Sequence, residues 1–316
     1  MMARDRWLSA GLAWAVLSMA AAQSAAQTPA PAAPPSVPMF RAQPATPMAL
    51  PVPIELGQGS GPAFQWTSLI RERVLRNSTR AQLYALRPTA GQADGPGKGR
   101  AVLVLPGGGY KFLAIENEGL PVAQRLAAAG YTAYVLVYRV MPTPVDDTAF
   151  AELVNAEIAQ RFAPGAAKAP IDLAAHGPAV DDALQAMAWL RAHAAEQGFS
   201  AARIALIGFS AGARTGRALV ERAEPAQMPD SLALIYGGFA STRPRAPVPP
   251  LFLAQAADDA LFPPDHFDIV QDWRRAGQRV ELHLYERGNH GFGLMAPRGN
   301  TSDGWFDSYL AWLARQ

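Results

Sequence analysis

A serine stands between two glycines in the stretch 208–212, which reads Gly-Phe-Ser-Ala-Gly. The apolar run Ile204–Ile207 precedes it, and a segment typical of a helix, Ala211–Arg222, follows it. This order predicts a sharp connection from strand to helix, in which only small residues at 208 and 212 allow the two elements to approach. Such a turn holds the Ser210 hydroxyl at the end of a sheet, beside helix N–H groups that favour negative charge.

Apolar runs alternate with helical patterns along the rest of the chain. Strands are predicted at Arg80–Leu86, Arg100–Leu105, Tyr131–Tyr138, Ile204–Ile207, Leu232–Tyr236, Leu251–Leu253 and Val280–Tyr285. Helices are predicted at Glu118–Ala129, Ala179–Ala195, Ala211–Arg222, Phe267–Arg275 and Ser302–Ala314. Because several strands are continuous apolar runs, the pattern predicts an α/β fold, with a mostly parallel central sheet and helices on both faces.

The segment 141–175 is irregular and contains four prolines around a predicted helix, Thr148–Arg161. It falls between a strand and a helix, on the side where the carboxyl ends of the strands lie. Two interpretations stay open for this segment: it shapes a binding site, or it decorates the surface.

The amino-terminal part has the features of a leader followed by a linker. Residues 1–26 combine an arginine-containing start, the uncharged apolar run Trp7–Ala22 and small residues suited to cleavage, which predicts a secretory signal peptide and a secreted or periplasmic protein. A membrane anchor is the alternative, but the run is short for a span of about 20 residues. Residues 27–53 are rich in Pro and Ala and predict a poorly ordered linker, and residues 54–316 predict one domain.

The composition and net charge of the chain argue against some classes of binding partner and against disulfide bonds. The formal net charge is +2, and no run of Lys or Arg is present, which argues against nucleic acid as a partner. The chain has no cysteine, so packing stabilises it without disulfides. We expect no stable membrane association after signal cleavage, and the sequence leaves the oligomeric state open.

Acyl transfer by a serine requires an imidazole base, a carboxylate that orients it, and N–H donors for the oxyanion. The chain has five histidines. His290 lies in the glycine-rich loop 288–293 after the predicted strand Val280–Tyr285, where glycines let the backbone bring the ring back over the strand ends. The other four lie in a strand, at or in helices, or at a helix start. We therefore predict His290 as the base for Ser210.

Two adjacent aspartates, Asp258 and Asp259, follow the predicted strand Leu251–Leu253. Both cannot be buried beside one imidazole without a raised pKa. The pattern Asp-x-x-apolar-Pro places the Asp259 carboxylate at the strand end, so we predict Asp259 as the partner of His290. Asp258 is the alternative, and otherwise caps the turn or faces solvent.

The glycine run 107–109 follows the predicted strand Arg100–Leu105. Consecutive glycines allow backbone N–H groups to line a cavity without side chains in the way. We predict an oxyanion hole formed by the N–H groups of Gly108, Gly109 and Ala211. A phosphate-binding loop is disfavoured, because no Gly-Lys-Ser or Gly-Lys-Thr follows.

On these motifs the sequence resembles the α/β-hydrolase superfamily and, within it, bacterial secreted esterases of the acetylxylan-esterase-like or carbohydrate-esterase type. The similar segments are 105–110 (Leu-Pro-Gly-Gly-Gly-Tyr), 118–123 (Glu-Gly-Leu-Pro-Val-Ala), 130–139, 207–212, 290–293 and 302–313. The resemblance covers the chain from about Arg100 to its end. It implies that 54–316 is an α/β-hydrolase catalytic domain that hydrolyses short acyl esters without a cofactor, and no metal site is predicted.

Two positions depart from the pattern of these relatives. Ala213 replaces the further glycine usual after the serine turn, and Arg214 stands where a histidine is often found. Arg139, at a strand end, is predicted to pair with an acid such as Glu118, with no role in the chemistry.

Three aromatic residues are candidates for substrate binding. Tyr110, Phe292 and Trp305 either stack on a sugar ring or wall the acyl pocket, or they belong to the core.

The expected function is a serine esterase that uses Ser210, His290 and Asp259 on short-chain, acetyl-type esters, with a small-molecule or carbohydrate ester as the substrate. A general carboxylesterase, a lipase or a peptidase of the same superfamily is the alternative. The peptidase is disfavoured for want of a large second domain, and the lipase because the predicted helix Thr148–Arg161 is charged. A non-catalytic binding protein is the least favoured alternative.

Overall fold

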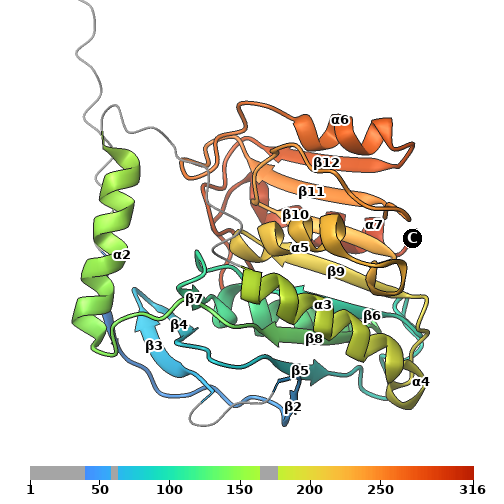
Figure 1. Ribbon diagram of the computed structural model, residues 1–316, viewed down its shortest axis with the longest axis horizontal. Helices are drawn as coiled ribbons and strands as arrows, with labels where there is room; N and C mark the ends of the chain where they lie inside the picture. Colours follow the sequence, from blue (N-terminus) through green and yellow to red (C-terminus); the bar gives the residue numbers. More distant parts are fainter. Residues whose placement is uncertain (1–39, 58–62, 164–176) are drawn as a thin grey trace, which may run out of the picture. The chain divides into compact units, whose positions relative to one another are not determined.

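The apolar runs of the sequence form the central strands of an eight-stranded sheet in the computed structural model, which describes residues 40–57, 63–163 and 177–316 (Figure 1). The strand order is β12-β11-β10-β9-β6-β8-β5-β2. The strands span Pro53–Glu55 (β2), Gln82–Leu86 (β5), Ala101–Leu105 (β6), Thr132–Val137 (β8), Ile204–Phe209 (β9), Ser231–Ile235 (β10), Leu251–Ala256 (β11) and Val280–Tyr285 (β12). The pairs from β12 to β8 are parallel, and β8, β5 and β2 pair antiparallel.

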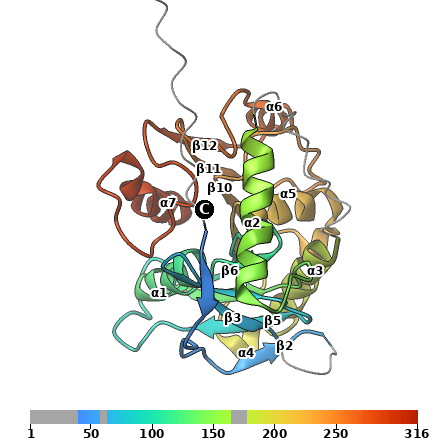
Figure 2. The same cartoon turned by 90° about the vertical axis from the view of Figure 1, so that its left-hand side faces the viewer.

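Helices cover both faces of this sheet, as the edge-on view in Figure 2 shows. One face carries α1 and α7, and the other carries α3, α5 and α6. The helices span Leu120–Ala128 (α1), Gly177–Ala192 (α3), Ala194–Gln197 (α4), Ala211–Arg222 (α5), Asp268–Arg275 (α6) and Trp305–Leu313 (α7). The predicted α/β fold with a mostly parallel sheet between helices is therefore confirmed. Of the helices within the described ranges, none has the length and apolar character needed to cross a membrane.

A second, four-stranded antiparallel sheet was not predicted from the sequence. It consists of Ala42–Pro44 (β1), Gln65–Leu69 (β3), Glu72–Arg76 (β4) and Phe112–Leu113 (β7), in the order β1-β3-β4-β7. Its strands are short, and β1 lies in a Pro/Ala-rich stretch that lacks the composition of a strand.

The predicted linker 27–53 is wrong for the residues that the structure describes. From residue 40 onward the chain belongs to the folded unit Met39–Gln316: β1 pairs with β3, and β2 begins at Pro53 and pairs with β5. These strands lie at sheet edges, where proline is tolerated because the missing N–H is not needed. The predicted signal peptide 1–26 and the first part of the linker lie outside the described residues.

The predicted helix of the irregular segment is confirmed as α2, Asp147–Phe162. Phe150 and Val154 of this helix pack with Leu69 and Val74 of the small sheet. A fully buried arginine, Arg76, adds a polar connection, because its guanidinium pairs with the Asp147 carboxylate at 2.6 Å. The helix is therefore fixed to the small sheet through its inward face and its first turn.

Strand β9 and helix α5 cross at two glycines, as the motif predicts. A Cβ on Gly208 would lie 2.4 Å from the Gly212 carbonyl oxygen, and a Cβ on Gly212 would lie 2.0 Å from the Leu105 carbonyl oxygen. Both distances are far below van der Waals contact, and both neighbours are backbone atoms that cannot rotate away. The absence of side chains at these positions brings α5 against both β9 and the end of β6.

Gly212→Ala is expected to destabilise the protein by about 2 kcal/mol or more, because the new methyl group forces α5 away from the end of β6. Gly304→Ala is the matched control, since a Cβ there meets nothing within 4 Å. We expect the control to change the free energy of unfolding by about 0.5 kcal/mol or less. Urea denaturation of both variants measures this, and equal stabilities would contradict the steric argument.

Candidate active site

The serine turn has the strained backbone that the motif predicts. Ser210 adopts φ 47° and ψ −111°, in the region that residues with a side chain rarely occupy. Its N–H donates to the Ile235 carbonyl oxygen of β10 at 2.9 Å, and its carbonyl accepts from the Arg214 N–H at 3.1 Å. These bonds on both sides hold the strained residue in place.

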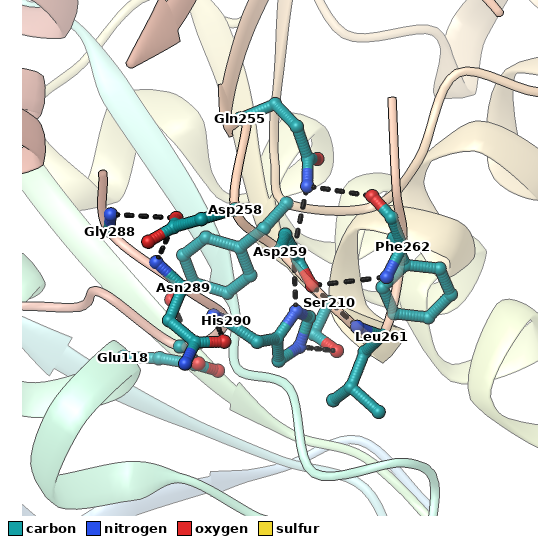
Figure 3. Close-up of polar contacts among 12 residues, drawn as sticks. Glu118, Ser210, Gln255, Asp258, Asp259, Leu261, Phe262, Gly288, Asn289 and His290 are labelled. Atoms are coloured by element: carbon teal, nitrogen blue, oxygen red, sulfur yellow. Dashed lines mark hydrogen bonds and ion pairs between the residues drawn. The ribbon is translucent and has the colours of Figure 1, made fainter. Parts of the chain in front are cut away.

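The structure brings the three predicted side chains into one hydrogen-bonded chain (Figure 3). His290 Nε2 lies 2.9 Å from Ser210 Oγ, and His290 Nδ1 lies 2.9 Å from Asp259 Oδ2. Asp259 is 1% exposed and Ser210 9% exposed, so the chain of contacts runs from the interior toward the surface. An imidazole held in this way can accept the serine proton through Nε2 while Nδ1–H stays bonded to the carboxylate.

The Asp259 carboxylate is held ionised by donors on every side. It accepts hydrogen bonds from the backbone N–H of Leu261 at 2.9 Å and of Phe262 at 3.0 Å, and from the Gln255 side-chain amide at 2.7 Å. Burial raises the pKa of Asp259, but the hydrogen bonds from His290 and from these backbone groups outweigh it and leave the pKa below its ordinary value. Asp259 is thus a charged partner for an imidazolium at neutral pH.

The neighbouring aspartate has a different role. Asp258 Oδ1 accepts from the backbone N–H of Gly288 at 2.9 Å and of Asn289 at 2.6 Å (Figure 3). Arg298 holds the same loop from its carbonyl side, with Nη1 donating to the Gly288 oxygen at 2.8 Å and the His290 oxygen at 3.1 Å. Asp258 therefore shapes the loop that carries the imidazole, and Asp259 contacts the ring itself.

The predicted oxyanion donors lie beside the serine. A Cβ on Gly107 would lie 2.8 Å from Ser210 Cβ, which places the glycine run next to Ser210. Gly108 and Gly109 have φ values of 127° and 61°, which favour glycine. Among the described residues, none accepts a hydrogen bond from the N–H of Gly108, Gly109 or Ala211. These three donors are therefore left for a ligand oxygen.

A buried carboxylate that the sequence did not reveal as a site residue supports this loop. Glu118 is 4% exposed, and it accepts hydrogen bonds from the Gly107 N–H at 2.5 Å and the Tyr236 hydroxyl at 2.8 Å. The Tyr236 ring in turn packs edge-on against the His290 ring, with centroids 5.0 Å apart. Glu118 thereby connects the loop 107–109 to His290.

Glu118 belongs to a short π-helix, η1 (Ile115–Gly119), that contacts both sides of the site. Its Asn117 side-chain amide donates to the Gly291 carbonyl oxygen at 3.0 Å, in the loop of the base. Glu118 begins the segment 118–123 that carries the family resemblance, but the sequence did not indicate these roles, because an acid at the start of a predicted helix is typical of an exposed first turn. Arg139 pairs with an acid, as predicted, but the acid is Asp182 and not Glu118, with Nη2 2.6 Å from Oδ1.

The three aromatic candidates are core residues. Tyr110, Phe292 and Trp305 are 1%, 3% and 1% exposed. Their side chains present no open face on which a sugar ring could stack. The core interpretation is the one that the structure supports, since the Tyr110 hydroxyl donates to the Ala211 carbonyl oxygen at 2.9 Å and Phe292 packs on Tyr236 with centroids 4.5 Å apart. No group of His, Asp and Glu suited to a metal ion occurs in the described part of the chain.

Comparison with known proteins agrees with this architecture. A sequence model of an α/β-hydrolase-fold family matches residues 174–248, which include the serine turn. MGS-M1, an α/β-hydrolase enzyme from a Medee basin deep-sea metagenome library, is a similar solved structure, with a TM-score of 0.58 and 23% identity over 84% of this chain and 96% of that one. The chain has the α/β-hydrolase fold. No match is found among curated protein sequences.

Two further solved structures are similar. An acetyl ester-xyloside bifunctional hydrolase from Caldicellulosiruptor lactoaceticus has a TM-score of 0.52 and 20% identity, covering 76% of this chain and 89% of that one. The propionate-bound esterase Est2 from Thermogutta terrifontis has a TM-score of 0.54 and 20% identity, covering 76% and 90%. At these identities the likeness establishes the fold.

A second carboxylate near Glu118 makes stability depend on pH. Glu72 Oε1 is buried and has no hydrogen-bond partner among the described residues. Burial, followed by the negative charges of Glu118 and Glu116, raises the pKa of Glu72 to about 8. In the unfolded chain a glutamate ionises near pH 4.3. The free energy of unfolding therefore falls as the pH rises from about 4.3 to about 8, and Glu72 causes no further decrease above that range.

Glu72→Gln removes this ionisation. We therefore expect the melting temperature of the variant, relative to that of wild type, to rise as the pH increases from 5 to 8.5. Each unit of pKa shift corresponds to about 1.4 kcal/mol, so the gain amounts to several degrees. Melting curves at pH 5, 7 and 8.5 measure it. Glu286→Gln, at a side chain that is 76% exposed, is the control. A gain that is constant with pH contradicts a raised pKa.

Proposed function

We propose that this protein is a serine esterase that hydrolyses short-chain acyl esters. The observation that carries the proposal is the Ser210–His290–Asp259 chain, with both contacts at 2.9 Å, beside three backbone N–H groups left for a ligand oxygen. A structural role for Ser210 alone, such as a helix cap, needs neither the buried aspartate nor the strained backbone.

The acylation step follows from the geometry. Ser210 Oγ attacks the carbonyl carbon of the ester while His290 Nε2 takes its proton. Asp259 keeps Nδ1–H in place and stabilises the imidazolium that forms. The tetrahedral intermediate then collapses, His290 returns the proton to the leaving alcohol, and the acyl group stays on Ser210.

Backbone donors stabilise the charge that develops in this step. The carbonyl oxygen becomes an oxyanion that accepts from the N–H groups of Gly108, Gly109 and Ala211, which are fixed before the reaction and need no reorganisation. Water attacks the acyl-enzyme in the second step, with His290 as the base. The Glu118 carboxylate has a positioning role, because its bond to Gly107 fixes the loop that carries two of the donors.

An acetyl or other short acyl group is the substrate that we favour, on a small molecule or a carbohydrate. Two similar structures support this choice: the Caldicellulosiruptor enzyme is an acetyl ester-xyloside hydrolase, and Est2 holds propionate or butyrate. We further propose that the protein is exported, on the strength of the charged start and the apolar run at its amino terminus. Fractionation of expressing cells and the mass of the mature chain test this point.

Hydrolysis of p-nitrophenyl esters from acetate to decanoate, for wild type beside Ser210→Ala, is the direct test. We expect the rate to be highest for acetate and to fall by about 10⁴-fold or more in the variant, because the nucleophile is lost. A maximum at medium chain lengths would indicate a general carboxylesterase. A variant as active as wild type would refute the mechanism.

The alternatives give different results in one further assay. We expect an organophosphonate to label Ser210 if the protein is a serine hydrolase; Est2 itself is phosphonylated by cyclosarin. Labelling without ester hydrolysis would point to a peptidase, and no labelling of folded protein would point to a binding protein.

The two aspartates allow a matched comparison. Asp259→Asn is expected to lower kcat by about 10³-fold to 10⁴-fold, because the amide cannot fix the correct imidazole tautomer or stabilise its charge. Asp258→Asn keeps an oxygen acceptor for the Gly288 and Asn289 N–H groups, so we expect a loss of about tenfold at most. Steady-state kinetics with p-nitrophenyl acetate compare them, and equal losses would contradict the assigned roles.

A further inference from the structure

An arginine stands beside the proposed active site without a compensating charge. Arg214 lies one helical turn after Ser210 on α5, and its guanidinium carbon sits 4.4 Å from the centre of the Phe262 ring. The same ring lies 5.3 Å from the His290 ring, centre to centre (Figure 3). One aromatic side chain therefore separates the Arg214 cation from the base.

A second cation reaches the same ring from another element. The guanidinium carbon of Arg161, in the last turn of α2, lies 5.3 Å from the Phe262 ring centre. Arg161 Nη2 also donates to the Leu261 carbonyl oxygen, in the turn that holds Asp259. Arg161 and Arg214 are both partly exposed, so a ligand from solvent can contact them.

Two buried arginines of this protein form ion pairs with a carboxylate. Arg76 pairs with Asp147 and Arg100 with Asp230, and each of these guanidinium groups is 2% exposed or less. In contrast, no carboxylate within the described ranges forms an ion pair with Arg214, and its Nε, like those of Arg100 and Arg217, is buried without a hydrogen-bond partner there. A desolvated cation in this state is costly unless an anion compensates it.

The charged groups around Arg214 are themselves positive. Burial, then the charge of Arg217, lowers the pKa of Arg214 to about 10, with a further contribution from Arg161. Arg217 has Glu221 one turn along the same helix as a neighbouring charge. Arg214 remains a cation at neutral pH, and no carboxylate within the described ranges forms an ion pair with Arg214 or Arg161, although the Asp259 carboxylate accepts the nearby Phe262 N–H.

We propose that Arg214 and Arg161 bind a carboxylate of the substrate, so that the preferred substrates are esters that carry a second, free carboxylate group. The inference rests on the proposed esterase function and specifies its substrate class. A guanidinium offers paired N–H donors that match the two oxygens of a carboxylate, and the partial desolvation at this position strengthens the interaction. Binding there places an anionic substituent one aromatic ring away from the reacting ester.

The free carboxylate can belong to the acyl group or to the alcohol group of the ester. Two pairs of isosteric substrates distinguish these two cases. For the acyl part, mono-4-nitrophenyl glutarate is compared with 4-nitrophenyl glutaramate, its neutral amide. For the alcohol part, 4-acetoxybenzoate is compared with 4-acetoxybenzamide. Within each pair the position of the reacting ester and the size stay the same and the charge changes, and each enzymatic rate is divided by the uncatalysed rate of the same ester, because the two members differ in intrinsic reactivity.

We expect wild type to favour the charged member of one pair by about tenfold or more in kcat/KM. Arg214→Gln and Arg161→Gln should each reduce this ratio severalfold or more, whatever their effect on the neutral member. Arg222→Gln is the matched control, because it removes one positive charge from the far end of the same helix, where Arg222 pairs with Asp181. Its ratio should equal that of wild type.

The following results test the carboxylate-binding inference separately from the proposed esterase function. Equal rates for the charged and neutral members of both pairs, or a preference that survives in both Arg214→Gln and Arg161→Gln, would overturn the inference and leave the esterase function intact. Loss of Ser210-dependent hydrolysis for every ester would overturn the function, and the inference with it. If Arg214→Gln does not fold, the Arg161→Gln variant carries the test, together with inhibition of wild type by glutarate, which should exceed inhibition by glutaramide about tenfold.

Discussion

The close crossing of α5 with β9 and with the end of β6 is the constraint on which the site depends. Gly208 and Gly212 leave only backbone between these elements, with Cβ positions that would fall 2.4 Å and 2.0 Å from carbonyl oxygens. The crossing brings Ser210 and the Gly107 loop together. The nucleophile and two of the three proposed oxyanion donors thus come from different strands, yet their separation is set by contact between main chains.

The crossing does not position the glycine loop or the His290 ring by itself. Hydrogen bonds to buried carboxylates hold these groups in place. Glu118 holds the Gly107 N–H and the Tyr236 hydroxyl, and Asp259 holds the His290 ring. The Gly107 loop and the His290 ring are thus each held by a buried carboxylate, and low local dielectric strengthens these hydrogen bonds. Arg214 differs from this pattern, because no carboxylate of the described residues pairs with it, and in our interpretation a substrate carboxylate is its partner.

The sequence predicted every strand of the central sheet except β2, most of its helices and the three interacting side chains, because each has a local signature. The serine turn needs its two glycines, the base needs a flexible loop after a strand, and one of two adjacent aspartates had to be buried. The small sheet could not be predicted, since β1 and β7 have three and two residues and gain stability from pairing rather than from their own composition. The contacts of Glu118 depend on residues 11 and 118 positions away, which no local pattern encodes.

The two aspartates at 258 and 259 have one further consequence. Asp258 bonds the backbone of the loop that carries His290, and Asp259 bonds the ring of the same residue. Adjacent side chains can do this only at a fixed register, because an inserted residue would shift one carboxylate away while the other kept its place. The connection after β11 is therefore constrained in length, and deletions or insertions between β11 and Phe262 should be far less tolerated than changes of side chain.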